Sequence, residues 1–244
     1  MPPDMHSALK TPAPENRAEQ IAREYEDFAY IVSHDLNAPL RHVREFTSLL
    51  IGGRREKLTD EECEYIRFLE KSLDRIDEMQ RALLSFSRLN TRAGDVRAVD
   101  FNEAVAAAIK DLDDIIKLHF PAIECRKLPT LVAEPQQIRL LFFHLIGNAL
   151  KFYDSETVKR KVIITAVDQG DVWLFEIKDN GIGIDKKYHR EVLRMFRRLE
   201  PELYPGIGAG LTIARKISQR HGGELLIESE AGQGTSVFFS IAKL

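Results

Sequence analysis

Two long stretches whose apolar residues recur at steps of three and four constrain the fold of this chain most strongly. They occupy about residues 17–50 and 59–90. Such spacing places the apolar side chains on one face of a helix, and that face must pack against another surface. Gly52 and Gly53 separate the two stretches and are typical of a helix end. The sequence therefore predicts two amphipathic helices joined by a tight turn, which is a helical hairpin.

A lone hairpin cannot cover both of its apolar faces. Pairing two hairpins into a four-helix bundle covers them, so we expect a homodimer. The alternative is a coiled coil within one chain that packs on a second domain. Thr59 and Glu62 have the spacing of a capping box at the start of the second helix. The apolar positions of the first helix are Ile21, Tyr25, Phe28, Val32, Leu36, Pro39, Val43, Phe46 and Leu50. Those of the second helix are Ile66, Leu69, Leu73, Ile76, Met79, Leu83 and Phe86.

After a linker at about residues 91–95 the pattern becomes a mixture of strands and helices. Strands are expected at about residues 96–99, 123–128, 131–133, 161–167, 172–178, 224–229 and 236–241. Helices are expected at about residues 100–118, with Asp100 and Glu103 as a capping box, and 135–152, with Pro135 in the first turn. A helix-and-loop region at about 185–208 precedes a last helix to about 220. This order predicts an α+β domain with a mixed sheet and helices on one face.

The chain is thus expected to comprise a flexible leader at residues 1–17, the hairpin domain at 18–93 and the α+β domain at 94–244. Four prolines among polar residues indicate the leader. A net charge of −3 argues against a nucleic-acid-binding protein. The longest apolar run, at residues 140–146, is too short to span a bilayer, and the first residues lack the pattern of a signal peptide. Cys63 and Cys125 are isolated, which favours reduced thiols in a cytoplasmic protein.

His34 is the first candidate functional residue. It lies two residues after Val32, so a rotation of about 200° places it away from the apolar face of its helix. Asp35 follows it, and Pro39 removes the helical hydrogen bond to the carbonyl of Asp35. Taken alone, an exposed histidine on a proline-containing helix is the simpler interpretation. The motifs of the second domain favour a functional one.

Three stretches of the second domain could together bind a nucleotide, although each alone is weak evidence. Asn148 and Lys151 lie three residues apart on a helix and can share one face, although a buried Asn can also be a satisfied core residue. Asp179 follows a strand and can accept an amino proton, while Gly181 and Gly183 allow close approach of the backbone to a flat ligand. The alternative for this segment is ordinary turn chemistry.

The third stretch, residues 206–211, opens a helix with the sequence GIGAGL. Free backbone amides at a helix N-terminus suit phosphate groups. Neither a complete P-loop nor a complete dinucleotide fingerprint is present in the sequence.

The order HDxxxPL, NxxK, DNGIGI, MFRRL and GIGAGL resembles the H, N, G1, F and G2 boxes in the transmitter module of sensor histidine kinases. The resemblance covers about residues 20–243, and the sequences HDLNAPLR and Tyr204-Pro-Gly are most similar to phytochrome-related kinases. It implies a dimeric four-helix bundle that carries the phosphoacceptor, followed by an α/β-sandwich ATP-binding domain of the gyrase type.

The resemblance also implies roles for individual residues. His34 would accept the γ-phosphoryl group of ATP, and Asp35 would orient its ring. Asn148 would ligate Mg²⁺, and Asp179 would bind the adenine amino group. The lid would span about residues 186–204. The remaining residues implied to line the nucleotide site or its lid are Lys151, Gly181, Gly183, Phe196, Arg197, Arg198, Gly206, Gly208, Gly210 and Leu211. For Arg197 and Arg198 a solvated lid face is the alternative to a phosphate contact.

Two positions depart from the family pattern. His144 stands where many relatives have an Asn, and Ala38 stands where kinases that also act as phosphatases often have Thr or Asn. The expected function is ATP-dependent autophosphorylation on His34, then transfer to a response-regulator receiver domain, with input from a separate sensory protein as one arrangement. The alternatives are a pseudokinase or phosphotransfer scaffold, which His144 favours, and a gyrase-type ATPase without phosphotransfer.

Overall fold

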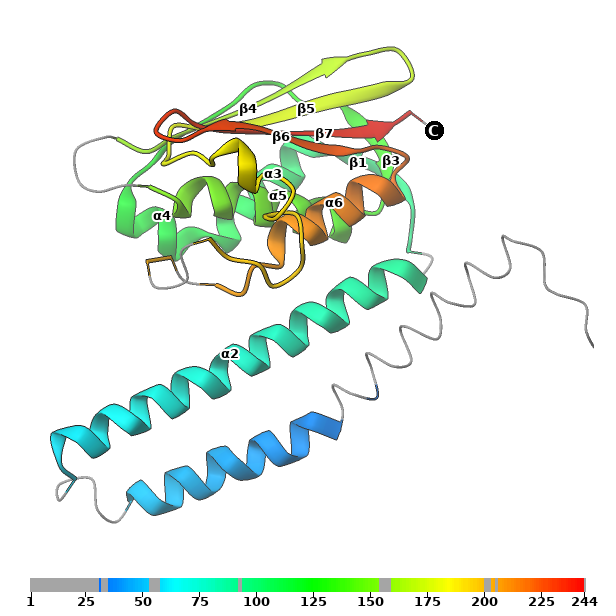
Figure 1. Ribbon diagram of the computed structural model, residues 1–244. Helices are drawn as coiled ribbons and strands as arrows, with labels where there is room; N and C mark the ends of the chain where they lie inside the picture. The colour runs from blue at the N-terminus through cyan, green and yellow to red at the C-terminus, as the bar shows by residue number, and fades with distance from the viewer. Residues whose placement is uncertain are drawn as a thin grey trace, which may run out of the picture. The chain divides into compact units, whose positions relative to one another are not determined.

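A computed structural model describes residues 31, 35–52, 58–91, 94–153, 159–199, 203–204 and 206–243 (Figure 1). The chain divides into two compact units, Met1–Ala93 and Gly94–Leu244. His34 and the leader at residues 1–17 lie outside the described residues. Among the described helices, none is both long enough and apolar enough to cross a membrane.

The first unit contains the predicted helical hairpin. Residues 35–52 form a continuous helix that includes Pro39, and α2 spans Asp60–Thr91. Arg44 of the first helix pairs with Asp74 at 3.0 Å and with Asp77 at 2.8 Å, so one guanidinium bridges the two helices. The hairpin is therefore confirmed.

The start of α2 is the capping box that the sequence predicts. The backbone N–H of Thr59 donates to a carboxylate oxygen of Glu62 at 2.7 Å. In return, the backbone N–H of Glu62 donates to the Thr59 hydroxyl at 3.2 Å. Two backbone donors at the helix end are thus satisfied reciprocally.

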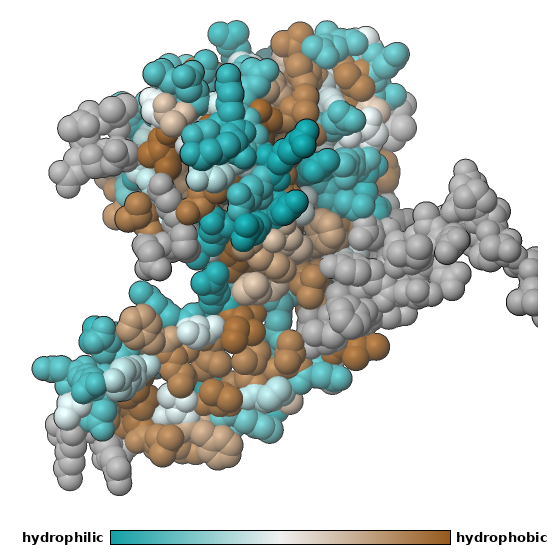
Figure 2. All heavy atoms as spheres, in the orientation of Figure 1, coloured by the Kyte–Doolittle hydropathy of each residue, from teal (hydrophilic) through white to brown (hydrophobic). Residues whose placement is uncertain are grey.

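The apolar face of the hairpin stays largely exposed in the single chain. Phe46 is 64% exposed and Leu50 is 76% exposed, and Figure 2 shows apolar side chains gathered along the hairpin. Other exposed apolar or aromatic side chains of the hairpin are Ile31, Leu36, Val43, Leu49, Tyr65, Phe68, Leu69 and Ile76. A contiguous apolar surface of this kind is typical of an interface.

A five-stranded mixed sheet forms one layer of the second unit. Its strands lie in the order β2-β4-β5-β7-β6. They span Ala122–Cys125 (β2), Lys161–Asp168 (β4), Val172–Asp179 (β5), Leu225–Glu230 (β6) and Gly234–Ala242 (β7). β2 runs parallel to β4, and the other neighbours are antiparallel, which confirms the predicted mixed sheet. A separate antiparallel pair joins β1 (Arg97–Asp100) to β3 (Thr130–Ala133).

The helices lie on one side of this sheet (Figure 1). They are α3 (Phe101–Asp111), α4 (Asp113–His119), α5 (Pro135–Lys151) and α6 (Gly210–Arg220). α5 is the central helix because it contacts both α3 and α6 as well as β4 and β5.

Four fully buried phenylalanines hold α5 on the sheet. Phe175 of β5 stacks on Phe239 of β7 with ring centroids 4.8 Å apart, and on Phe101 of α3 at 5.0 Å. Phe142 of α5 meets all three rings edge-on at 5.7–6.3 Å. Edge-to-face and offset arrangements are the favoured geometries of aromatic pairs. This cluster therefore sets the position of α5, whose last turn carries Asn148.

The single helix predicted at residues 100–118 is wrong, because the chain breaks at Leu112 into α3 and α4. Leu112 is 4% exposed, and its side chain packs against α5 at Gly147, where an added Cβ would lie 3.4 Å from Leu112 Cδ2. Tertiary packing therefore overrides the continuous helical pattern.

The predicted capping box of α3 is only half right. Asp100 caps the helix by accepting from the backbone N–H of Asn102 at 2.8 Å. The Glu103 side chain returns no hydrogen bond to a described residue. The region at residues 185–208 contains only a short 3₁₀ helix, η2 (Lys186–Tyr188), and turns in its described part.

Replacing Phe142 with Ala should lower the free energy of unfolding of the second unit by about 3–5 kcal/mol, because it leaves a cavity among three buried rings. Phe120→Ala is the control, since this ring is 78% exposed and its loss should cost under about 0.5 kcal/mol. Urea unfolding followed by the fluorescence of Trp173, on β5, measures both. Equal losses for the two variants would contradict the central role of Phe142.

Candidate functional site

The last two turns of α5 bring three polar side chains to one face. His144, Asn148 and Lys151 lie four and three residues apart, and all three are half-buried. Buried neighbours such as Leu145 and Leu150 hold this turn in place. The Asn148 amide makes no hydrogen bond with the part of the chain that the structure describes. Asn148 is therefore not a satisfied core residue, and its oxygen is available to a ligand.

Asp179 ends β5 and accepts two backbone hydrogen bonds. The donors are the N–H of Gly181 at 2.8 Å and the N–H of Thr235 at 3.1 Å. Burial raises the pKa of Asp179 to about 6, and the two amide donors offset part of this rise. The side chain is thus a partly buried acceptor that is mostly ionised at pH 7.

Close packing of the backbone requires glycine at two positions after Asp179. A Cβ on Gly181 would lie 2.1 Å from the carbonyl oxygen of Phe152, the C-cap residue of α5. Gly183 has a φ of +66°, and its Cβ would lie 2.0 Å from the carbonyl oxygen of Glu230. These contacts exclude any side chain, so the glycines allow backbone segments to pack closely around Asp179.

The side chains of Asn180 and Tyr153 also hold the turn after Asp179. The Tyr153 hydroxyl donates to the Asn180 side-chain oxygen at 2.6 Å, and the backbone N–H of Lys161 donates to that oxygen at 2.7 Å. The Asn180 amide group donates to the Lys159 carbonyl at 3.1 Å. The sequence did not indicate either residue, because an Asn in Asp-Asn-Gly is also ordinary turn chemistry and the partners of Tyr153 lie in other elements.

The glycine segment before α6 lies against the face of α5 that carries His144 and Lys151. A Cβ on Gly206 would lie 2.6 Å from the Lys151 ammonium nitrogen. A Cβ on Gly210, the first residue of α6, would lie 3.2 Å from His144 Nδ1. Ala209 supplies no side-chain cap, so the first amides of α6 are left for solvent or a ligand. Leu211 follows in the first turn and is half-buried.

The described residues 186–199 are tied to this glycine segment through a backbone hydrogen bond. The N–H of Phe196 donates to the Gly208 carbonyl at 2.8 Å, and Phe196 has a φ of +65°. Arg197 pairs with Glu191 at 2.5 Å. Arg198 donates to the backbone carbonyl of Tyr204. Both arginines are therefore engaged with the protein itself in this structure.

His144 is a neutral group in this site. Burial lowers its pKa to about 4, because the charged imidazolium would lose its hydration. Its ring lies 5.4 Å from that of Phe143 and beside Gly210. At neutral pH His144 therefore offers a hydrogen-bonding ring and no charge.

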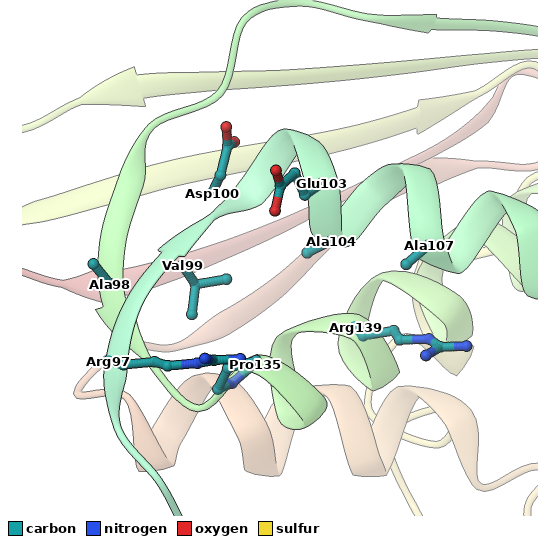
Figure 3. A pocket seen from close by; sticks show the side chains of 9 residues that line it. All are labelled: Arg97, Ala98, Val99, Asp100, Glu103, Ala104, Ala107, Pro135 and Arg139. Carbon is teal, nitrogen blue, oxygen red and sulfur yellow. The ribbon is translucent and has the colours of Figure 1, made fainter.

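The structure brings the glycine segment next to Lys151 and His144, and the turn after Asp179 next to Phe152. Asp35 lies in the other unit, on the helix at residues 35–52. No three His, Cys, Asp or Glu side chains cluster as a metal site within the described ranges. A pocket of about 350 Å³ lies elsewhere in the second unit, between β1, α3 and the start of α5 (Figure 3). None of the predicted site residues lines it.

Comparison with known proteins identifies both units. A family model described as "Histidine kinase-, DNA gyrase B-, and HSP90-like ATPase" matches residues 133–244. A model described as "His Kinase A (phospho-acceptor) domain" matches residues 24–92.

Curated relatives include the phytochrome-like protein Cph1 of Synechocystis sp., which is 32% identical over 230 residues, covering 91% of this chain and 30% of the relative. Cyanobacterial phytochrome A of Nostoc sp. is 33% identical over 224 residues, covering 91% of this chain and 29% of the relative. The chain therefore spans about 30% of the length of these relatives.

Solved structures share the fold. Full-length ShkA in complex with AMPPNP has a TM-score of 0.66 at 24% identity, covering 90% of this chain and 47% of that one. The Acinetobacter baumannii histidine kinase AdeS has a TM-score of 0.53 at 17% identity, covering 82% of this chain and 97% of that one. A phospho-acceptor domain is thus followed by a histidine kinase-type ATPase domain, and the chain belongs to the sensor histidine kinases as a transmitter module homologous to those of phytochrome-related kinases.

Proposed function

We propose that this chain is an ATP-dependent protein-histidine kinase that phosphorylates itself on His34 and passes the phosphoryl group to an aspartate of a response-regulator receiver domain. One observation carries the proposal. The glycine segment before α6 lies against Lys151 and His144, while the end of α5 also contacts the turn after Asp179. An acceptor for a base and donors for phosphates therefore meet around one helix end.

Asp179 would hold the adenine. A carboxylate has about four lone-pair sites, and two backbone donors already occupy part of that capacity. A remaining site can accept the exocyclic amino proton. The close backbone packing at Gly181 and Gly183 keeps this acceptor fixed in the absence of ligand.

The phosphates would lie at the N-terminus of α6. Its first amides have no side-chain cap, and Lys151 adds a positive charge beside Gly206. Gly206 and Gly208 both have positive φ, so this segment can present backbone donors in a geometry that other residues rarely adopt. Gly210 and Leu211 open the helix itself.

Asn148 would hold Mg²⁺. Its side-chain oxygen is a hard ligand, and the described residues leave it without a hydrogen-bond partner. Mg²⁺ commonly takes one or two protein oxygens, with phosphate oxygens and water completing its shell, so the absence of a carboxylate cluster among the described residues fits this ion. The ion would supply charge neutralisation on the phosphates.

The reaction would form a bond between a ring nitrogen of His34 and the γ-phosphorus, break the bond from that phosphorus to the β-γ bridging oxygen, and release ADP. Asp35, next in sequence, would orient the ring and accept its other proton. Phosphoryl transfer depends mainly on positioning and charge neutralisation. Phe196, Arg197 and Arg198 would act through the lid that covers the nucleotide.

A non-enzymatic scaffold is the second candidate, and His144 is the feature that favours it. A neutral, half-buried imidazole replaces the amide of many relatives beside the proposed metal ligand. Asn148, Asp179 and the glycine segment are all present, which favours catalysis.

Incubation of the purified chain with Mg²⁺ and γ-labelled ATP tests the kinase proposal. We expect incorporated label that is acid-labile and base-stable, as a phosphorus–nitrogen bond would be, and none in His34→Ala. His42→Ala is the matched control and should keep the label, because this exposed histidine lies outside the proposed site.

Nucleotide binding without label would contradict the kinase proposal and favour the scaffold, with His144→Asn as the next variant. Steady ATP hydrolysis without a phosphoprotein would favour the gyrase-type ATPase.

Adenosine affinity should depend on the ionisation of Asp179. Since the pKa of this carboxyl is about 6, the accepting form is present above pH 6 and is lost below it. Affinity should therefore fall about tenfold for each pH unit below 6. His144, with a pKa of about 4, stays neutral over most of this range.

In Asp179→Asn, adenosine should bind about 10–100-fold more weakly at pH 7 and without this pH dependence, because a charged acceptor is lost. Asp168→Asn changes an exposed carboxylate that pairs with Lys243 and should leave binding unchanged. Titrations from pH 5 to 8, followed by NMR, measure both variants, and an unaltered pH profile in Asp179→Asn would refute the assignment.

The hairpin should form a homodimer through its exposed apolar face. Phe46→Glu places a charge on that face and should shift the chain to a monomer, because a buried unpaired charge is costly. Lys71→Glu alters an exposed position of α2 and should leave the dimer intact. Light scattering after gel filtration gives the mass, and a Phe46→Glu dimer as stable as the parent would contradict this interface.

A further inference from the structure

Tyr204 makes three contacts within the second unit, with Phe152, Tyr153 and Arg198. Its ring lies 5.1 Å from that of Phe152 at an interplanar angle of 61°. Its hydroxyl donates to the backbone carbonyl of Tyr153 at 3.2 Å. Its own backbone carbonyl accepts from the guanidinium of Arg198. Three contacts therefore hold Tyr204, although it is the last residue of the segment proposed as the lid.

Hydrogen bonds to other elements hold the two residues after α5 that Tyr204 contacts. The Phe152 carbonyl accepts from the Ile182 N–H at 3.0 Å and packs against Gly181. Tyr153 is 6% exposed, and its hydroxyl is bonded to Asn180 at 2.6 Å and to the Lys161 N–H at 3.0 Å. Residues 152 and 153 are thus anchored to β4 and to the turn after β5. Tyr204, which precedes the glycine segment, therefore contacts the same two residues that hold the turn after Asp179.

Lys151 also contacts Phe152. Its ammonium nitrogen lies 5.0 Å from the centroid of the Phe152 ring, which is a cation–π contact. Two residues beyond Tyr204, Gly206 lies next to the same ammonium group. One aromatic ring therefore contacts both the lysine and the tyrosine that precedes the glycine segment.

We infer that Tyr204 is a positioning residue for the phosphate side of the nucleotide site, acting as a latch between the end of α5 and the glycine segment. The inference rests on the proposed function, since it takes Lys151 and residues 206–210 as the phosphate-binding groups. Tyr204 is outside the buried aromatic cluster of the core, so its loss should leave the unit folded. A latch on the phosphate side should affect the binding of phosphates and spare that of the base.

Calorimetric titration of the full chain with MgATP, beside an NMR titration with adenosine, separates the two sides of the site. Tyr204→Ala should weaken MgATP binding about tenfold, because it removes a hydrogen bond and an aromatic contact that order the segment. Tyr204→Phe keeps the ring and should lose about threefold. Adenosine affinity should stay within about twofold of the parent in both, since Asp179 and its backbone donors are unchanged.

Tyr65→Phe is the matched control. It removes the hydroxyl that bonds Glu61 on α2, outside the second unit, and should leave both affinities unchanged. Trp173 fluorescence during urea unfolding checks that each variant is folded.

Three results would overturn the latch: unchanged MgATP affinity in Tyr204→Ala, tighter MgATP binding, or equal losses for MgATP and adenosine. The proposed function fails in a different way. A parent chain that binds neither ligand would refute the nucleotide site and the latch with it. A parent that binds MgATP but transfers no phosphoryl group would refute the kinase, while the Tyr204 titrations would still decide the latch.

Discussion

The packing of α5 on the five-stranded sheet is the interaction on which the site depends. Phe142 inserts edge-on among three other buried rings and so fixes both the axial position and the rotation of the helix. A helix rises about 1.5 Å and turns about 100° per residue, so a slip of one residue would carry Asn148 and Lys151 away from their present face. The core of the domain therefore determines where the polar groups of the site lie.

The two sides of the site are built differently. Around Asp179 backbone segments pack closely, and the glycines at 181 and 183 lie where no side chain fits. On the opposite side, the Tyr204 ring meets the Phe152 ring from a separate segment, and Phe152 also contacts the ammonium group of its neighbour Lys151. Backbone packing leaves few alternative arrangements, whereas side-chain contacts can form and break. This difference suits a fixed site for a base beside a segment that moves with the phosphates.

Local signals predicted much of the fold because the relevant interactions are local. The capping box at Thr59 and Glu62 forms within one helical turn, and the start of α5 at Pro135 needs only a fixed φ and a missing donor. The prediction of one helix at residues 100–118 failed because Leu112 turns inward onto α5. The role of Asn180 was missed because its partners at Tyr153 and Lys161 come from other elements.

The sequence by itself determined the apolar faces of the hairpin, the mixed strand-and-helix order of the second domain, and the order of the five motifs. These follow from periodicity and from residue types, which are properties of short segments. Only the tertiary structure decided that Asp179 has a raised pKa and His144 a lowered one, since both shifts come from burial by distant segments. It also decided that Tyr204 meets the end of α5, because chain packing alone brings residues some fifty positions apart into contact.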